Sequence, residues 1–172
     1  MSAYLRLRAV PPPALRNSPA WLERQFDDGG EAAARYQGGR HREEVLDERY
    51  PDQERIYAGA FPHRIEDGPR AQVVLGGRPL LRPRGHEPHL RVLTAAQTRR
   101  VAGFLATAEF DALWLSARDA LLPRYGGPTA EPETRGAFAA VHRELRTFYA
   151  RTAECGDAVV KWLPARRVPV TP

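Results

Sequence analysis

The side chains in this sequence that could do chemistry are few, and the first group is a short histidine-containing loop. His86, Glu87 and His89 put two imidazoles and a carboxylate within four positions, which is how a metal site can begin. The intervening proline holds the loop without bringing both rings to one point, so a third ligand would have to come from His63, His41 or a distant acid. We therefore predict no metal site and no cofactor. A hydrolase-like or metal-assisted enzyme, with a cleft lined by these histidines and the central acids, is the alternative interpretation.

Two other histidines stand close to carboxylates, as general acid–base catalysis would require. His142 precedes Glu144 by two positions, and His41 precedes Glu43 and Glu44. Residues two apart on a helix do not face each other, so neither pair is a catalytic signature. His142 also follows an apolar position, which predicts a place at the flank or surface of its helix. On these grounds we predict no catalytic residue.

The only cysteine, Cys155, is the one candidate for a nucleophile or a redox sensor. It follows a long helical pattern, and the negative end of the helix dipole disfavours a thiolate there. Glu154 and Asp157 flank it, whereas reactive cysteines have positive surroundings. The sequence therefore predicts a packing cysteine at a helix end. A single cysteine also excludes an internal disulfide and is typical of a reducing compartment such as the cytosol.

Basic residues gather in one central segment, residues 78–100. This segment holds six arginines and one glutamate, so it carries the whole net charge of +5, and the rest of the chain is neutral. Arginine forks suit carboxylates and phosphates. No aromatic residue interleaves the loop and no recognition-helix pattern is present, so nucleic-acid binding is the weaker interpretation. The residues predicted to bind an anion or a partner are Arg78, Arg82, Arg84 and Arg91.

Four segments carry the patterns of strands that would hold these residues in place. Residues 3–9 alternate between apolar and polar positions, which is typical of a half-buried strand. Residues 71–75 and 158–163 are short apolar runs next to glycines, and residues 90–93 form a fourth candidate strand. Strands at both ends of the chain and in its middle predict an α+β fold with a small mixed sheet covered by helices.

Helix boundaries are marked most clearly in the second half of the chain. Ser18 followed by proline predicts a first helix, and residues 94–97 fit a capping box. Thr107 is predicted to cap the next helix. A longer helix is predicted to begin near Glu133 and to end at Gly156, where glycine suits a left-handed backbone. In the polar middle of the chain, the pattern favours short helices over about 42–50 and about 53–59.

The order of these elements resembles the DUF1877 (YfbM-like) family, which is bacterial. The resemblance covers residues 1–28 and 71–164, and it implies a single α+β domain with no established activity. Between them, family members carry a tryptophan- and histidine-containing helix after a leucine–aspartate pair, whereas Leu46 and Asp47 are followed here by a different sequence. The matching positions are Tyr4-Leu5-Arg6, Ser18-Pro19-x-Trp21-Leu22, Leu93-Thr94, Phe110-Asp111, Leu145-Arg146-x-Phe148-Tyr149 and Gly156-Asp157-Ala158-Val159.

Length and composition suit one cytosolic domain. The chain has 172 residues, 42% of them hydrophobic, and we expect a single domain over 1–172 with a flexible tail at 164–172. No stretch reads as a signal peptide or a membrane span. The favoured function is a non-catalytic interaction or binding protein, of accessory or immunity type, that docks an acidic protein partner through the basic central loop. The alternatives are the enzyme described above and a weak nucleic-acid binder.

Overall fold

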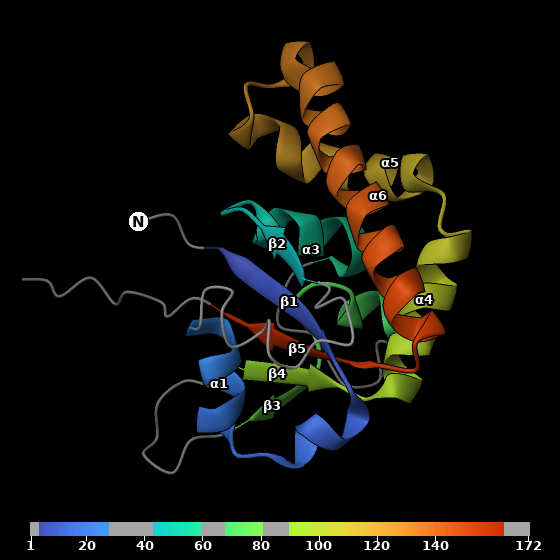
Figure 1. Cartoon of the computed structure of the whole chain (residues 1–172). Coiled ribbons are helices and arrows are strands. Elements are labelled where there is room, and N and C mark those ends of the chain that lie inside the picture. The colour runs from blue at the N-terminus through green and yellow to red at the C-terminus, as the bar shows by residue number, and fades with distance from the viewer. Residues whose placement is uncertain (1–3, 28–42, 60–67, 81–89, 164–172) are drawn as a thin grey trace, which may run out of the picture.

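The computed structural model describes residues 4–27, 43–59, 68–80 and 90–163, and its centre is a five-stranded sheet (Figure 1). The strand order is β2-β1-β5-β4-β3, so the strands from the two ends of the chain lie side by side in the middle. The strands are β1 (Leu5–Val10), β2 (Glu43–Leu46), β3 (Arg78–Leu80), β4 (Leu90–Leu93) and β5 (Ala158–Trp162).

Helices follow the strands and cover both faces of this sheet (Figure 1). Among the helices that the structure describes, none is long and apolar enough to cross a bilayer. The α-helices are α1 (Pro19–Asp27), α3 (Tyr50–Ala58), α4 (Ala95–Thr107), α5 (Phe110–Leu121) and α6 (Glu131–Glu154). The 3-10 helices are η1 (Pro12–Arg16), η3 (Pro69–Gln72), η4 (Leu122–Arg124) and η5 (Pro128–Ala130).

One face of the sheet packs against α4 and α6. The alternation in β1 turns Leu5 and Leu7 to this face, where they join Val159 of β5 in the largest buried cluster. Residues from the helices complete the cluster, including Leu105 of α4 and Leu145 of α6, both fully buried. Burying this apolar surface is the main force that holds the helical layer to the sheet.

The opposite face packs against α1 and carries a second cluster. Val160 of β5 and Val92 of β4 point this way, and Leu22 and Phe26 of α1 cover them. The helix that Ser18 and the following proline predict is therefore α1, and its apolar residues face the sheet. Arg8 of β1 also points to this face and is 6% exposed.

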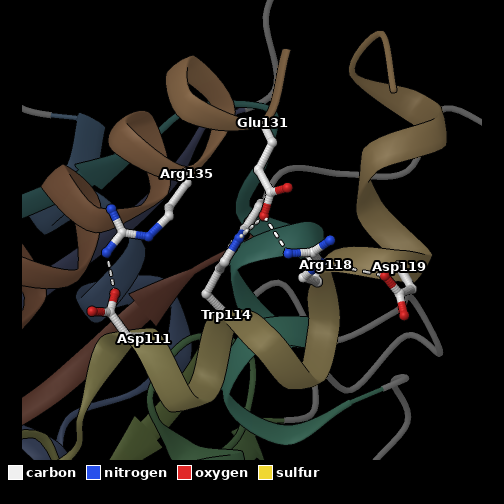
Figure 2. A network of polar contacts seen from close by, with 6 residues as sticks. All are labelled: Asp111, Trp114, Arg118, Asp119, Glu131 and Arg135. Atoms are coloured by element: carbon white, nitrogen blue, oxygen red, sulfur yellow. Dashed lines mark hydrogen bonds and ion pairs between the residues drawn. The ribbon is translucent and has the colours of Figure 1, made fainter. Parts of the chain in front are cut away.

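A third cluster joins the helices at the far end of α6 from the sheet. Trp114 of α5 is buried there with Phe138 of α6 and Ile56 of α3. Figure 2 shows the polar contacts that join α5 to the first turns of α6 at this end. Glu131, in the first turn of α6, accepts a hydrogen bond from the indole Nε1 of Trp114 at 3.0 Å and forms an ion pair with Arg118 at 2.9 Å.

Two helix boundaries follow the predicted signals closely. Thr94 accepts a hydrogen bond from the backbone N–H of Gln97 at 3.2 Å, and the Gln97 side chain accepts one from Thr94 N–H at 2.9 Å, which is a complete capping box. Gly156 has a φ of 71° and follows the last turn of α6, as a left-handed stop requires. The predicted strands at 3–9, 90–93 and 158–163 are likewise confirmed as β1, β4 and β5.

Four of the predictions were wrong in detail. The predicted helix at 42–50 is strand β2, held by the pairing of Glu43 with Arg8 across the sheet. The predicted strand at 71–75 is the end of η3 and a turn. Thr107 is the last residue of α4 and does not cap α5, whose N-cap position is Glu109, a residue that makes no side-chain capping bond. The described strand pairs are all antiparallel, so the sheet is not mixed.

Three other predictions concern one helix, the fold class and the C-terminal tail. The helix predicted at about 53–59 is confirmed as α3, although it begins at Tyr50. The α+β class is also confirmed. The predicted tail at 164–172 lies outside the described residues.

Candidate functional site

The sheet separates two of the four arginines that were predicted to act together. Arg78 of β3 pairs with Val92 of β4, and paired residues share a face, so Arg78 projects to the α1 side. Arg91 is the neighbour of Val92 in β4 and therefore projects to the other side. Arg82 and Arg84 lie outside the described residues. Arg78 and Arg91 consequently do not form one surface.

Arg91 is half-buried and lies among other polar groups. Its Nη1 lies 3.5 Å from the carbonyl oxygen of Gly77, and it pairs in register with Lys161 of β5. Burial lowers the pKa of its guanidinium, and the nearby carboxylate of Glu54 opposes that shift. Among the residues of the basic segment that the structure describes, the exposed arginines are instead Arg78, Arg99 and Arg100.

The only lysine of the chain, Lys161, is fully buried at the centre of the sheet. Its Nζ donates to the carbonyl oxygens of Gln72 at 2.5 Å, Val73 at 3.2 Å and Gly76 at 2.9 Å. An ammonium has three donors, and these three carbonyls use all of them. Burial lowers the pKa of Lys161 to about 7, with the charge of Glu54 acting against the shift.

This lysine fastens the turn that follows η3 to the sheet. Tyr149 of α6 adds a hydrogen bond from its hydroxyl to the carbonyl oxygen of Val73 at 2.7 Å. Glu54 of α3 accepts one from the backbone N–H of Leu75 at 3.0 Å. Backbone carbonyls and an amide of segment 72–76 are therefore hydrogen-bonded to buried side chains and not to a neighbouring strand. This explains why an apolar run is not a strand here. A lone lysine inside an apolar strand pattern is the sequence signal that could have revealed this cluster.

A second buried polar group lies between α3 and α6. The hydroxyl of Tyr57 is 3.0 Å from Nδ1 of His142, and it accepts a hydrogen bond from Nε2 of Gln53 at 3.2 Å. His142 is only 5% exposed, so the prediction of a flank or surface histidine was wrong. Burial lowers the pKa of this imidazole, and the charges of Arg146 and Arg143 lower it further.

Asp52, next to this group on α3, is also buried and engaged. It forms an ion pair with Arg124 and accepts a hydrogen bond from the hydroxyl of Tyr125 at 2.7 Å. Three successive polar residues of α3 are thus buried. Asp52 contacts η4, Glu54 contacts the turn after η3, and Gln53 bonds Tyr57 of its own helix, which in turn contacts His142 of α6. These contacts are structural, because they join α3 to η4, to α6 and to the turn after η3. The residues are Asp52, Gln53 and Glu54.

The other residues considered for chemistry are Cys155 and the remaining histidines, and the structure describes only Cys155. Cys155 lies at the C-cap of α6, as predicted, but its side chain is exposed, so it is not a packing residue. His41, His63, His86 and His89 lie outside the described residues. Within the described ranges no group of three or more histidine, cysteine, aspartate or glutamate side chains could hold a metal ion.

A surface hollow of about 460 Å³ lies between the edge strand β2 and α6. Glu44 and Glu144 meet there, with Arg143 beside them. Burial raises the pKa of the Glu44 carboxyl, and the like charge of Glu144 raises it further. Glu144 therefore lies across this hollow from β2 and is not directed at His142 on its own helix.

These features define an α+β domain whose antiparallel sheet is covered on both faces and whose buried polar groups join the layers. The chain belongs to the DUF1877 family, because the model of that family, described as a domain of unknown function, matches residues 2–162. The resemblance found in the sequence is thereby confirmed.

A solved structure has the same fold. It is the crystal structure of a protein of unknown function, YfbM from Escherichia coli, with a TM-score of 0.60 and 13% sequence identity. The similarity covers 95% of this chain and 99% of that chain. At this identity the comparison shows the fold alone. A search of curated proteins found no match.

Proposed function

We propose that this protein is a non-catalytic interaction protein of the cytosol, of accessory or immunity type, that binds an acidic protein partner through its basic segment 78–100. The observation that carries the proposal is the distribution of charge: this segment holds the whole net charge of +5, and the rest of the chain is neutral. Complementary charge accelerates encounter and selects among partners.

The exposed arginines support this proposal. Arg78 in β3 is exposed on the α1 side of the sheet, and Arg99 and Arg100 are exposed in α4, which packs on the other face. Each guanidinium group can therefore meet a carboxylate without first breaking a core contact. Arginine forks bind carboxylates in a bidentate manner. Arg91 contributes to the fold beside Lys161 and is not part of the proposed contact surface.

The buried polar residues support a non-catalytic function. His142, Lys161 and Asp52 are side-chain types that enzymes use, but each is engaged by structural partners in the core. A catalytic group has to reach a substrate, and these three are between 0% and 6% exposed.

The test is affinity capture with charge-reversed variants of the full chain. The reversal variant carries Arg78→Glu, Arg82→Glu and Arg84→Glu. Arg91 is left unchanged, because a glutamate there would face the buried carboxylate of Glu54. The matched control variant makes the same change of charge at three exposed arginines outside the segment: Arg16→Glu, Arg24→Glu and Arg146→Glu.

We expect the wild-type protein and the control variant to retain the same acidic protein, identified by mass spectrometry, and the reversal variant to lose it. The interaction should weaken as salt increases, because exposed charges are screened. Partners that the reversal variant still retains would refute the proposal. Binding of a DNA duplex that is lost steeply with salt and with the reversal would instead support the nucleic-acid alternative.

A further inference from the structure

A second hollow, of about 320 Å³, lies between the end of β1, η1 and α1, three elements that are consecutive in the chain. In the sheet, β5 and β4 separate β1 from β3 and its exposed Arg78. The volume corresponds to about ten water molecules at about 30 Å³ each, and small-molecule sites begin at about this size. The hollow can therefore hold a small organic molecule.

Among the described residues that line the hollow, no charged group is available to a ligand. The one charged residue is Arg8, which is 6% exposed. Its guanidinium forms an ion pair with Glu43 at 2.6 Å and lies over Phe26, 4.9 Å from the ring centre, and neither partner lines the hollow. A charged ligand would lose hydration here without gaining an ion pair, so the hollow favours a neutral molecule.

Two amide side chains at the walls have hydrogen-bonding groups that the protein does not use. Gln25 of α1 is half-buried, and its side chain forms no hydrogen bond within the described part of the chain. Asn17 donates from Nδ2 to the carbonyl oxygen of Ala14 at 3.1 Å, so its Oδ1 remains an acceptor. The hollow therefore offers a ligand both a donor and acceptors, and none of them carries a charge.

The other walls are apolar, and several of them are flat. Trp21 of α1 is half-buried and contributes an indole, and Pro11 and Pro13 contribute rigid rings. Val10 and Ala14, both buried, complete the apolar lining. Aromatic faces bind flat rings by offset stacking. A mostly apolar pocket with a few polar groups that fix orientation is the usual form of a small-molecule site.

We infer that this hollow, the Trp21–Gln25 hollow, binds a small neutral heterocycle that contains a ring amide, with the flat ring on Trp21 and the amide edge on Gln25. A carboxamide side chain presents a donor beside an acceptor, and a ring amide presents the complementary pair, so two hydrogen bonds can form at once. Carboxamides recognise the donor–acceptor edges of flat heterocycles in this way. The inference does not depend on the partner surface proposed above.

The test uses 2-quinolone, a bicyclic ring amide, as the probe and records the indole N–H signals of the three tryptophans by NMR. Trp21→Phe identifies the signal of Trp21. We expect 2-quinolone to shift that signal saturably and to leave the signal of Trp114, which is buried in another cluster, unchanged. N-methyl-2-quinolone has the same rings but no N–H donor, so it should bind about tenfold more weakly.

Gln25→Leu tests the amide contact. Leucine has a similar size and lacks both hydrogen-bonding groups, so the variant should bind 2-quinolone about tenfold more weakly than the wild type. The preference for 2-quinolone over N-methyl-2-quinolone should fall from about tenfold to about twofold or less. Ala20→Leu is the matched control, because it adds the same side chain at an exposed position of α1 that does not line the hollow. It should keep both affinities within about twofold of the wild type.

The melting temperature shows whether Gln25→Leu folds, and we expect little change because the Gln25 side chain has no hydrogen bond to lose within the described residues. The comparison of the two probes uses the wild-type protein alone and stays decisive if the variant does not fold. The inference is wrong if N-methyl-2-quinolone binds as tightly as 2-quinolone, if folded Gln25→Leu behaves like Ala20→Leu, or if 2-quinolone leaves the Trp21 signal unmoved up to its solubility limit.

Discussion

The hydroxyl oxygen of Tyr57 lies 3.0 Å from Nδ1 of His142, inside the core where a residue of α3 meets a residue of α6. This oxygen also accepts from Gln53, and its own proton can be donated to Nδ1 in the tautomer of the neutral imidazole that carries its proton on Nε2. The pair joins two helices whose residues are 85 positions apart.

Tyr57→Phe should destabilise the protein by about 1–3 kcal/mol, because it leaves the buried Nδ1 of His142 and Nε2 of Gln53 without their partner. Urea unfolding followed by circular dichroism measures the change. Tyr4→Phe is the control, since Tyr4 is 47% exposed, and it should stay within about 0.5 kcal/mol of the wild type. Equal stabilities for the two variants would contradict the structural role of the pair.

His142 should make stability fall in mild acid. Its folded pKa is lowered from 6.5, so the unfolded chain takes up a proton first as the pH falls through 6.5. The contribution of the neutral ring is complete above that pH and is lost below it. His142→Asn cannot titrate, so the difference in unfolding free energy between wild type and variant should depend on pH in this window. A difference that stays constant would show that His142 titrates alike in both states.

Lys161 should titrate near pH 7 and not near its ordinary value of 10.5. The unfolded state holds this proton up to the higher pH, so the contribution of Lys161 to stability should rise with pH between about 7 and about 10.5. Because the chain has one lysine, selective ¹³C labelling of lysine gives a single Cε signal whose shift reports the pKa directly. A midpoint at 10 or above would mean that the three carbonyls keep the ammonium charged.

Glu131 accepts a hydrogen bond from Trp114 and forms an ion pair with Arg118 (Figure 2), and two substitutions of Glu131 can separate their contributions to stability. Glu131→Gln keeps an acceptor for the indole and loses the partly exposed ion pair, which should cost less than about 1 kcal/mol. Glu131→Ala also leaves the buried Nε1 of Trp114 unsatisfied and should cost about 1–3 kcal/mol. Glu133→Ala, at an exposed position, is the control. Equal losses for the two Glu131 variants would show that the ion pair dominates.

Two glycines near opposite ends of α6 should respond oppositely to alanine. Gly156 has a φ of 71°, so Gly156→Ala forces a strained backbone and should cost about 1–2 kcal/mol. Gly136 lies within the helix with open space around its Cβ position, so Gly136→Ala should stabilise the protein by about 0.5–1 kcal/mol. Thermal unfolding compares both with the wild type. A stable Gly156→Ala variant would show that α6 can end without a left-handed residue.

Local patterns in the sequence were sufficient for the elements that depend on neighbouring residues. The alternation in β1, the capping box at Thr94 and the stop at Gly156 each rest on residues within a few positions of one another, and each was confirmed. The same approach failed for β2 and for the turn after η3. Those segments owe their conformation to Arg8 and to Lys161, which lie far away in the sequence.

The predicted sites depended even more on distant contacts. Arg78 and Arg91 look like members of one cluster in the sequence, but the period of two along β4 and the register with β3 send them to opposite faces. His142 looks like a surface residue from its neighbours, yet Tyr57 holds it in the core. Neither result can be read from a window of a few residues.

By itself, the sequence determined the α+β class, the family, the capping box at Thr94, the strands β1, β4 and β5, and the gathering of charge in residues 78–100. Only the tertiary structure decided which polar residues are buried, which arginines share a face, and where hollows form beside α1 and α6. The physical reason is separation along the chain. Caps and periodicity act within a few residues, whereas the bond from Lys161 to Gln72 joins residues 89 positions apart and exists only once the sheet has formed.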